Sequence, residues 1–203
     1  RSSNNLTRLL DNIDDITQLT NENTPEANKA FLKNYIVKLL KALDVDSNLP
    51  TERIDRIKDA IAELVGIDTR NAEAVASRNY QKNSSFLNDT SPLKFSAFDK
   101  NILILQLIAR LIDPKRINQR QEQVCGVNSL MYAIAQDEPI TYSRYIAELA
   151  KTGNAKLSFG GQKGLEVKIS DEKIFRRPRR IALLKQNSER DYIDDVDFIS
   201  LVG

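Results

Sequence analysis

The stretch SAFDKNILILQLIARLIDP, residues 96–114, contains the longest apolar run of the 203-residue chain. The run is apolar nearly all round, which is typical of a helix enclosed by other helices. Ser96 and Asp99 can cap its start, and Pro114 cannot continue it. The run is too short to cross a bilayer and is followed by Arg110, so we expect no membrane span. The stretch therefore predicts a buried helix at the centre of a bundle.

Amphipathic stretches precede this central helix, and turn signals separate them. Apolar residues recur at helical spacing in three sets, which are Leu6, Leu9, Leu10, Ile13 and Ile16, then Phe31, Leu32, Tyr35, Ile36, Leu39, Leu40 and Leu43, then Ile54, Ile57, Ile61, Leu64 and Val65. Pro25 and Pro50 mark the starts of the second and third helices, and Gly66 marks the end of the third. We therefore predict a helical bundle region over residues 1–114, including a weaker helix over 69–80.

The second part of the chain changes from helical to strand-like patterns. Two helices should begin at Cys125 and Pro139, and Gly153 is the expected end of the second. Their buried faces would be formed by Val127, Leu130, Met131 and Ile134 in the first and by Tyr142, Tyr145, Ile146 and Leu149 in the second. Short strands are expected at AKLSF (155–159), GLEVKIS (164–170) and RRIALLK (179–185), and a strand or short helix at YIDDVDFISLV (192–202). The predicted fold class is α+β, mostly α, with a boundary near Asp113 to Asn118 and a partial α+β domain over residues 115–203.

Charge and composition bear on the class of partner and on cofactors. Thirty basic and 28 acidic residues leave a net charge of +2, so we expect no nucleic-acid partner. The single cysteine cannot form an internal disulfide, and without histidine a His/Cys metal cluster cannot form. The glycines at 160, 161 and 164 lack the lysine-serine ending of a phosphate loop, and DYIDDVD (191–197) lacks the glycine and glutamate of a calcium loop. We expect no cofactor and no metal.

The cysteine stands in NQRQEQVCGVNSLMYAIAQ, residues 118–136, at an expected helix start. The positive end of a helix stabilises a thiolate, and Gly126 would let a substrate approach the backbone. Gln119 lies six residues upstream, from where its side-chain amide can donate to an oxyanion; Gln121 and Gln123 are the competing donors. The alternative is a small core residue, because free cysteine is among the most buried residue types. Two further polar residues, Asn128 and Ser129, fit solvent or capping roles.

Gln119-x5-Cys125-Gly126, followed by an apolar helix and glycine-separated strands, resembles the papain-like cysteine peptidase fold over about residues 118–185. The resemblance implies that Cys125 attacks a carbonyl, that Gln119 and a backbone N–H hold the oxyanion, and that a later histidine with Asn or Asp completes the site. The Cys-Gly pair looks most like the papain-like domains of bacterial toxins and translocated effectors, which include proteases, deamidases and acyltransferases. These imply a protein substrate or host protein as partner, and secretion or translocation into a host cell; otherwise the protein would be cytoplasmic.

The chain contains no histidine, and no other side chain replaces it well as the base. The histidine could lie beyond Gly203, could have been lost, or could never have been needed because Cys125 is structural. The chain begins with Arg1 rather than methionine and ends in strand-like sequence, so we favour a piece of a longer protein whose histidine follows Gly203. We therefore expect the 203-residue chain to be inactive. The rival interpretation is a non-catalytic helical protein-interaction module with a structural cysteine.

One cluster of arginines suggests a second kind of site. FRRPRR, residues 175–180, could combine with Lys115, Arg116 and Arg120 into a patch for phosphate or an acidic partner. The near-zero net charge and the lack of interleaved aromatic residues favour a solvated turn between strands instead.

Overall fold

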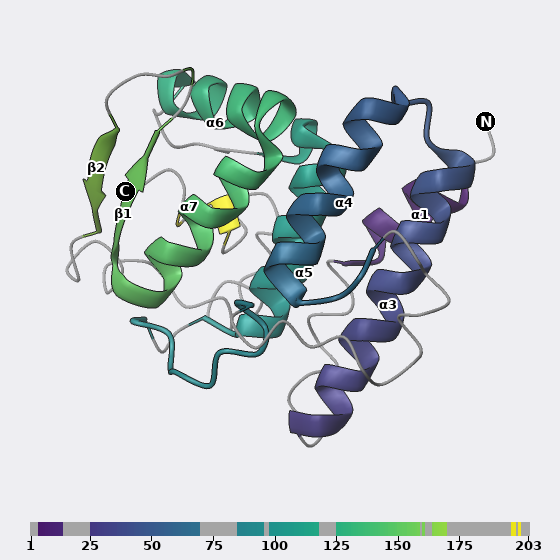
Figure 1. Cartoon of the computed structure of the whole chain (residues 1–203), viewed down its shortest axis with the longest axis horizontal. Coiled ribbons are helices and arrows are strands. Elements are labelled where there is room, and N and C mark those ends of the chain that lie inside the picture. Colours follow the sequence, from purple (N-terminus) through teal and green to yellow (C-terminus); the bar gives the residue numbers. More distant parts are fainter. Residues whose placement is uncertain are drawn as a thin grey trace, which may run out of the picture.

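Helix α5 (Lys100–Ile112) forms the centre of the fold in the computed structural model (Figure 1). Every residue from Ile102 to Ile112 is buried, which confirms the prediction of a central helix. The Asp99 carboxylate caps its start by accepting hydrogen bonds from the backbone N–H groups of Asn101 at 2.8 Å and Ile102 at 3.0 Å. After α5 ends, the 3₁₀ turn η2 (Pro114–Arg116) redirects the chain.

The structure describes residues 4–13, 25–69, 85–95, 98–117, 125–158, 160, 164–169, 196, 197 and 199. The remaining helices in these ranges are α1 (Asn5–Asp11), α3 (Pro25–Asp46), α4 (Thr51–Val65), α6 (Cys125–Asp137) and α7 (Pro139–Thr152). Three of their termini follow the predicted signals closely. Pro25 begins α3, and Gly66 and Gly153 end α4 and α7 in the left-handed conformation, with φ of 67° and 76°. The expected weaker helix over 69–80 lies almost entirely outside the described residues.

A single hairpin follows α7 in the described part of the chain. Strands β1 (Asn154–Leu157) and β2 (Leu165–Lys168) pair antiparallel, with Ala155 opposite Val167. The buried side chains of the hairpin, Ala155, Leu157 and Val167, belong to the same core cluster as α7. Two of the predicted strands are thus confirmed, and the third, over 179–185, lies outside the described residues.

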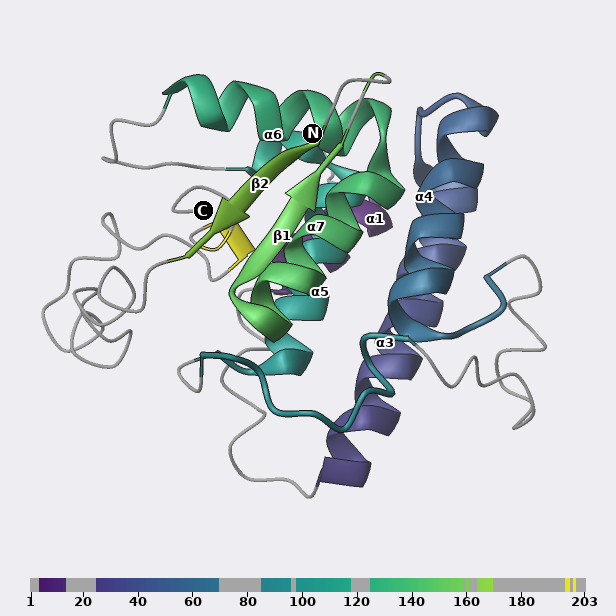
Figure 2. The same cartoon turned by 60° about the vertical axis from the view of Figure 1, so that its left-hand side comes forward.

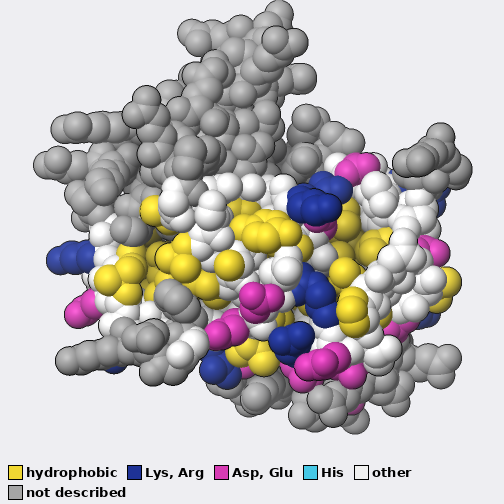
Figure 3. All heavy atoms as spheres, turned by 90° about the horizontal axis from the view of Figure 1, so that it is seen from above, with side chains coloured by type: hydrophobic (Ala, Val, Ile, Leu, Met, Phe, Trp, Pro, Cys, Tyr) yellow, Lys and Arg dark blue, Asp and Glu magenta, His cyan; other side chains and the backbone are white. Residues whose placement is uncertain are grey.

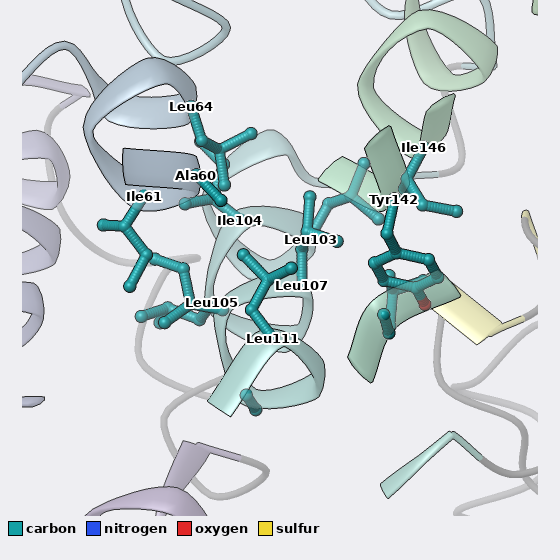
Figure 4. Packing of buried hydrophobic residues seen from close by; sticks show 14 of the residues in the cluster. Ala60, Ile61, Leu64, Leu103, Ile104, Leu105, Leu107, Leu111, Tyr142 and Ile146 are labelled. Atoms are coloured by element: carbon teal, nitrogen blue, oxygen red, sulfur yellow. The ribbon is translucent and has the colours of Figure 1, made fainter. Parts of the chain in front are cut away.

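The helices and the hairpin share one hydrophobic core. Figure 4 shows Ala60, Ile61 and Leu64 of α4 facing a row of α5 side chains, with Tyr142 and Ile146 of α7 on the other side. Helix α7 packs against both α4 and α5, so buried residues from before and after the expected boundary near residues 113–118 belong to one core. The α+β, mostly α fold class predicted from the sequence agrees with this arrangement.

Two buried polar side chains of α5 hold a helical segment near the end of the chain. The Gln106 Oε1 atom accepts a hydrogen bond from the Val196 backbone N–H at 3.2 Å. The Arg110 guanidinium binds the Asp197 carboxylate with both ends, Nε to Oδ1 at 3.1 Å and Nη2 to Oδ2 at 2.8 Å. The sequence predicted either a strand or a short helix over residues 192–202. Of the described residues in this range, Val196, Asp197 and Ile199 are helical.

The predicted buried face of α6 needs one correction. Met131 and Ile134 are buried as expected and Leu130 is partly buried, but Val127 is 38% exposed. The reason is that α6 packs against α7 and η2 along its later turns, whereas its first turn reaches past the core to the edge of the molecule (Figure 2). A periodic apolar stripe indicates which side of a helix faces inward, but not how far along the helix the core extends.

Candidate functional site

The direction of α6 is set at its C-terminal end by two arginines of α4. Arg53 donates through Nη1 to the Gln136 carbonyl and through Nη2 to the Leu111 carbonyl, the latter at 3.3 Å. Arg56 donates through Nη1 to the Asp137 carbonyl at 3.1 Å. Cationic donors at a helix C-terminus satisfy carbonyls that have no partner within the helix and complement the negative end of its dipole. These three hydrogen bonds join the last turn of α6 to α4 and, through Arg53, to α5.

The opposite end of α6 carries the candidate nucleophile. Cys125 is the first residue of this 13-residue helix, as the sequence predicted. The backbone N–H groups of a first helical turn lack partners within the helix and point toward the N-terminal side, where they and the dipole favour negative charge. The Cys125 side chain and the whole of Gln119, Gln121 and Gln123 lie outside the described part of the structure. The juxtaposition of Gln119 with the thiol therefore stays a prediction.

The first turn of α6 is open to solvent. Gly126 is exposed, and a Cβ atom added there would meet no atom within 4 Å. Val127 and Ser129 are also exposed. Among the described residues, none with a buried side chain lies within 4 Å of the Cβ position at Gly126, so these residues leave the backbone there accessible.

The described residues on the face of α6 that begins at position 125 are at most half-buried over the next two turns. Residues three, four and seven positions apart share one face of a helix. On α6 these are Asn128 and Tyr132, which are half-buried, and Ser129, which is exposed. The Oδ1 atom of Asn128 is enclosed, and no described residue donates a hydrogen bond to it. The exposure of Ser129 agrees with the solvent role expected for it.

The basic patch expected around FRRPRR is only partly described. Arg116 is engaged in the fold, because its Nη2 lies 2.6 Å from the Asp11 carboxylate of α1 and its Nε lies 3.5 Å from Asp113. Lys115 is exposed. Arg120 and residues 175–180 lie outside the described residues. Within the part that is described, Arg116 therefore ties η2 to α1.

A cleft that the sequence did not reveal opens between α4, α7 and β1. It has a volume of about 510 Å³, and its lining includes Glu63, Tyr145 and Lys156. Burial raises the pKa of Tyr145 to about 12. The lining residues come from segments up to about ninety positions apart, so no local sequence pattern could have indicated this cleft.

An ion pair beside this cleft fixes the loop before α5 to α7. The Lys151 ammonium lies 2.7 Å from the Asp89 carboxylate. The Lys151 ammonium and the Ser91 backbone N–H both donate hydrogen bonds to the Asp89 carboxylate, and together they hold the pKa of Asp89 well below its usual range. The hydrogen bond to Asp89 also raises the pKa of Lys151.

The described residues also bear on metal-ligand clusters and on membrane-spanning helices. Within them, no group of three or more Cys, Asp or Glu side chains is arranged to hold a metal ion. None of the helices traced in these ranges combines the length and apolar character needed to cross a membrane.

Comparison with known proteins leaves the chain without an assigned family: no protein-family model, no curated protein and no solved structure matches it.

Proposed function

We propose that the chain is the nucleophile-bearing part of a cysteine-dependent hydrolase or acyl-transferring enzyme, a protease or glutamine deamidase, in which Cys125 attacks the carbonyl. The observation that carries this proposal is the place of Cys125 at the first residue of α6, in a turn whose next two residues are exposed. A structural cysteine would gain nothing from a helix N-terminus. A nucleophilic one gains a lower thiol pKa from it.

The chemistry follows from that position. The thiolate sulfur adds to an amide or thioester carbonyl carbon, and the carbonyl π electrons move to oxygen. The resulting oxyanion would be held by the backbone N–H of Cys125 and the side-chain amide of Gln119. Collapse of this intermediate expels the amine, ammonia or thiol, which takes up a proton, and leaves an acyl group on sulfur. Water or an acceptor then releases the acyl group.

The proton transfers need a base that this chain does not contain, because it has no histidine. The proposal therefore assigns the nucleophile and the oxyanion donors to these 203 residues and the imidazole to a source outside them. The chain alone should not turn over. From the resemblance to papain-like effector domains, we propose a protein substrate, specifically a host protein met after secretion or translocation.

A second candidate function is supported by the surface of α6. No charged residue occurs on the helix before Asp137, and Gly126, Val127 and Ala133 face solvent. Figure 3, which views the molecule from the side where α6 lies, shows hydrophobic side chains gathered on this face. Such a surface would suit a non-catalytic protein-interaction module with a structural cysteine.

Alkylation of the single thiol separates the two candidates. The rate of reaction with iodoacetamide against pH gives the thiol pKa, and Cys125 is the only cysteine that can react. We expect a pKa below the free-thiol value of about 8.5. A matched control places the thiol on the same helix away from its end, as Ala133→Cys in a Cys125→Ala background, since Ala133 is exposed. Its pKa should be ordinary.

Two results would contradict the enzyme proposal. One is a Cys125 thiol that reacts only after denaturation, which would show a core residue. The other is a pKa equal to that of the Ala133→Cys control, which would show that the helix terminus has no effect. Either result would leave the interaction module as the better account.

A further inference from the structure

The cleft between α4 and β1 has the backbone of an open strand edge as one wall. Helix α7 forms its floor, with Tyr145 and Glu148 among the lining residues, and α4 forms the opposite wall through Glu63 and Leu64. Figure 2 shows β1 lying over α7, with one edge paired to β2 and the other facing α4. The volume of about 510 Å³ lies within the range of ligand-binding pockets, about 300–1,000 Å³.

The ladder between the strands shows which backbone groups face the cleft. The Ile169 N–H donates to the Gly153 carbonyl at 2.8 Å, so these two residues form a hydrogen-bonded pair. In an antiparallel ladder such pairs alternate with non-bonded ones, so Ala155 and Leu157 also direct their N–H and C=O groups toward β2. The backbone groups of the alternate residues, Asn154, Lys156 and Ser158, therefore point away from β2.

Among the described residues, hydrogen bonds occupy only the start of this outer edge. The Asn154 N–H donates to the Thr152 Oγ1 at 3.0 Å, and the Thr152 hydroxyl donates to the Asn154 carbonyl at 2.6 Å. The outward N–H and C=O groups of Lys156 and Ser158 make no hydrogen bond to another described residue. Two donors and two acceptors are thus presented at the spacing of an extended strand.

The side chains of these two residues leave the edge accessible. A Cβ atom built on Gly164 of the facing strand segment would lie 2.5 Å from Lys156 Cε and 2.3 Å from Ser158 Oγ. The side chains of Lys156 and Ser158 therefore occupy the space that a side chain at position 164 would fill, on the side of β1 that faces β2. Lysines often protect strand edges from pairing, but here the ammonium-bearing chain leans away from the open edge.

The charges around the cleft are largely paired among themselves. The Arg144 guanidinium of α7 binds Glu63 of α4, with Nη2 to Oε2 at 2.7 Å, and Lys151 is paired with Asp89. Of the other charged residues in the lining, Glu148 is acidic and Lys156 is basic, and the Lys156 side chain leans toward Gly164. A ligand of this cleft therefore needs no net charge, and its affinity would come from backbone pairing and from apolar contact with the α7 floor.

We propose that the open edge of β1 binds an uncharged, extended segment of a partner polypeptide, which adds as a third strand beside β1. Alternate side chains of the segment would point to the floor formed by Tyr145 and its neighbours, so small apolar residues fit there. A second copy of this chain fits the site less well. The wall formed by α4 stands opposite the edge, and symmetric pairing through Lys156 would place two lysines directly opposite each other.

The test uses nuclear magnetic resonance on the whole chain with the blocked peptide acetyl-Thr-Val-Thr-Val-Thr-amide. In the free protein, the Lys156 and Ser158 amides should exchange with solvent fast, and the Ala155 and Leu157 amides slowly. Peptide at millimolar concentration should slow the exchange of the Lys156 and Ser158 amides. Because pairing to a backbone edge depends little on side chains, the absence of binding at a few millimolar would overturn the proposal.

Variants of Ser158 and two N-methylated peptides identify the groups that bind. Ser158→Pro removes one outward N–H without touching the ladder and should weaken binding at least about tenfold, whereas Ser158→Ala should not. If Ser158→Pro unfolds the hairpin, two peptides N-methylated at alternate positions replace it, and only the one keeping its β1-facing N–H groups should bind. Equal binding of both peptides, or amide protection that rises with protein concentration in the absence of peptide, would refute the partner segment. Cys125→Ala should bind normally, since this site does not depend on the proposed enzyme function.

Discussion

Removal of the Asp197 carboxylate should destabilise the protein by about 3–5 kcal/mol, because it leaves the Arg110 guanidinium charged in the core. Both side chains are almost fully enclosed, at 5% and 1% exposure, and two hydrogen bonds join them. Water has little access to either group, so in Asp197→Ala the Arg110 cation keeps its desolvation cost and loses the Asp197 carboxylate, while its Nη1 still donates to the Gln106 carbonyl at 3.4 Å. Urea unfolding followed by circular dichroism would measure the loss.

The double replacement Arg110→Met with Asp197→Leu separates the cost of an orphaned charge from the value of the pair. Replacing both partners with apolar side chains of similar size is often neutral or stabilising, so the double variant should lie within about 2 kcal/mol of the parent protein. As a control, Asp44→Ala removes the carboxylate that pairs with Lys58; because the Asp44 side chain is 46% exposed, the change should cost less than about 1 kcal/mol. A single Asp197→Ala cost below about 1 kcal/mol, or a double variant as unstable as the single one, would refute this reasoning.

Three further predictions concern packing, backbone and titration. Leu105→Ala should cost about 2–5 kcal/mol of unfolding free energy in urea, since Leu105 is 2% exposed on the central helix; a change within about 0.5 kcal/mol would show that α5 is not central. In thermal melts, Gly153→Ala should destabilise the protein by about 1 kcal/mol or more, because φ is 76° and the new Cβ would lie 3.3 Å from Phe95 Cζ. Gly126→Ala, which has open space around the new Cβ, should be neutral or stabilising in the same measurement. The Tyr145 phenol, with its pKa raised to about 12 by burial, should ionise above the ordinary tyrosine value of about 10 in an ultraviolet titration. Because the unfolded chain loses that proton first, stability should fall as pH rises from about 10 to 12, and less so in Tyr145→Phe.

Local signals explain which parts of this fold could be predicted from the sequence. Pro25, Gly66 and Gly153 act through their own backbone preferences, so the helix ends that depend on them could be located without knowledge of the tertiary structure. The central place of α5 could also be predicted, because a helix that is apolar on all sides has to be enclosed. The start of α6 at Cys125 followed from the change to an apolar helical pattern.

Contacts between distant segments explain what could not be predicted. The carbonyls of Gln136 and Asp137 accept from Arg53 and Arg56, over eighty positions earlier, and no spacing rule connects such residues. The prediction that Val127 is buried was wrong for the same reason, because the extent of the core beneath α6 depends on where α7 and η2 lie. Whether Gln119 approaches Cys125 also depends on tertiary placement, and it stays a prediction.

Arg53 and Arg56 of α4 bind the carbonyls of the last turn of α6, so a shift of these arginines would tilt the helix about its C-terminal end. Its 13 residues rise by roughly 18 Å from Cys125 to Asp137, so a tilt of about 5° at that end would carry the first turn by about 1.5 Å. Displacements of about 1 Å at a reacting group are enough to change rates by about two orders of magnitude. Under the proposed function, conservative changes at Arg53 or Arg56, such as lysine, should therefore change the reactivity of Cys125 without touching it, which makes the surface of α4 a target for directed evolution.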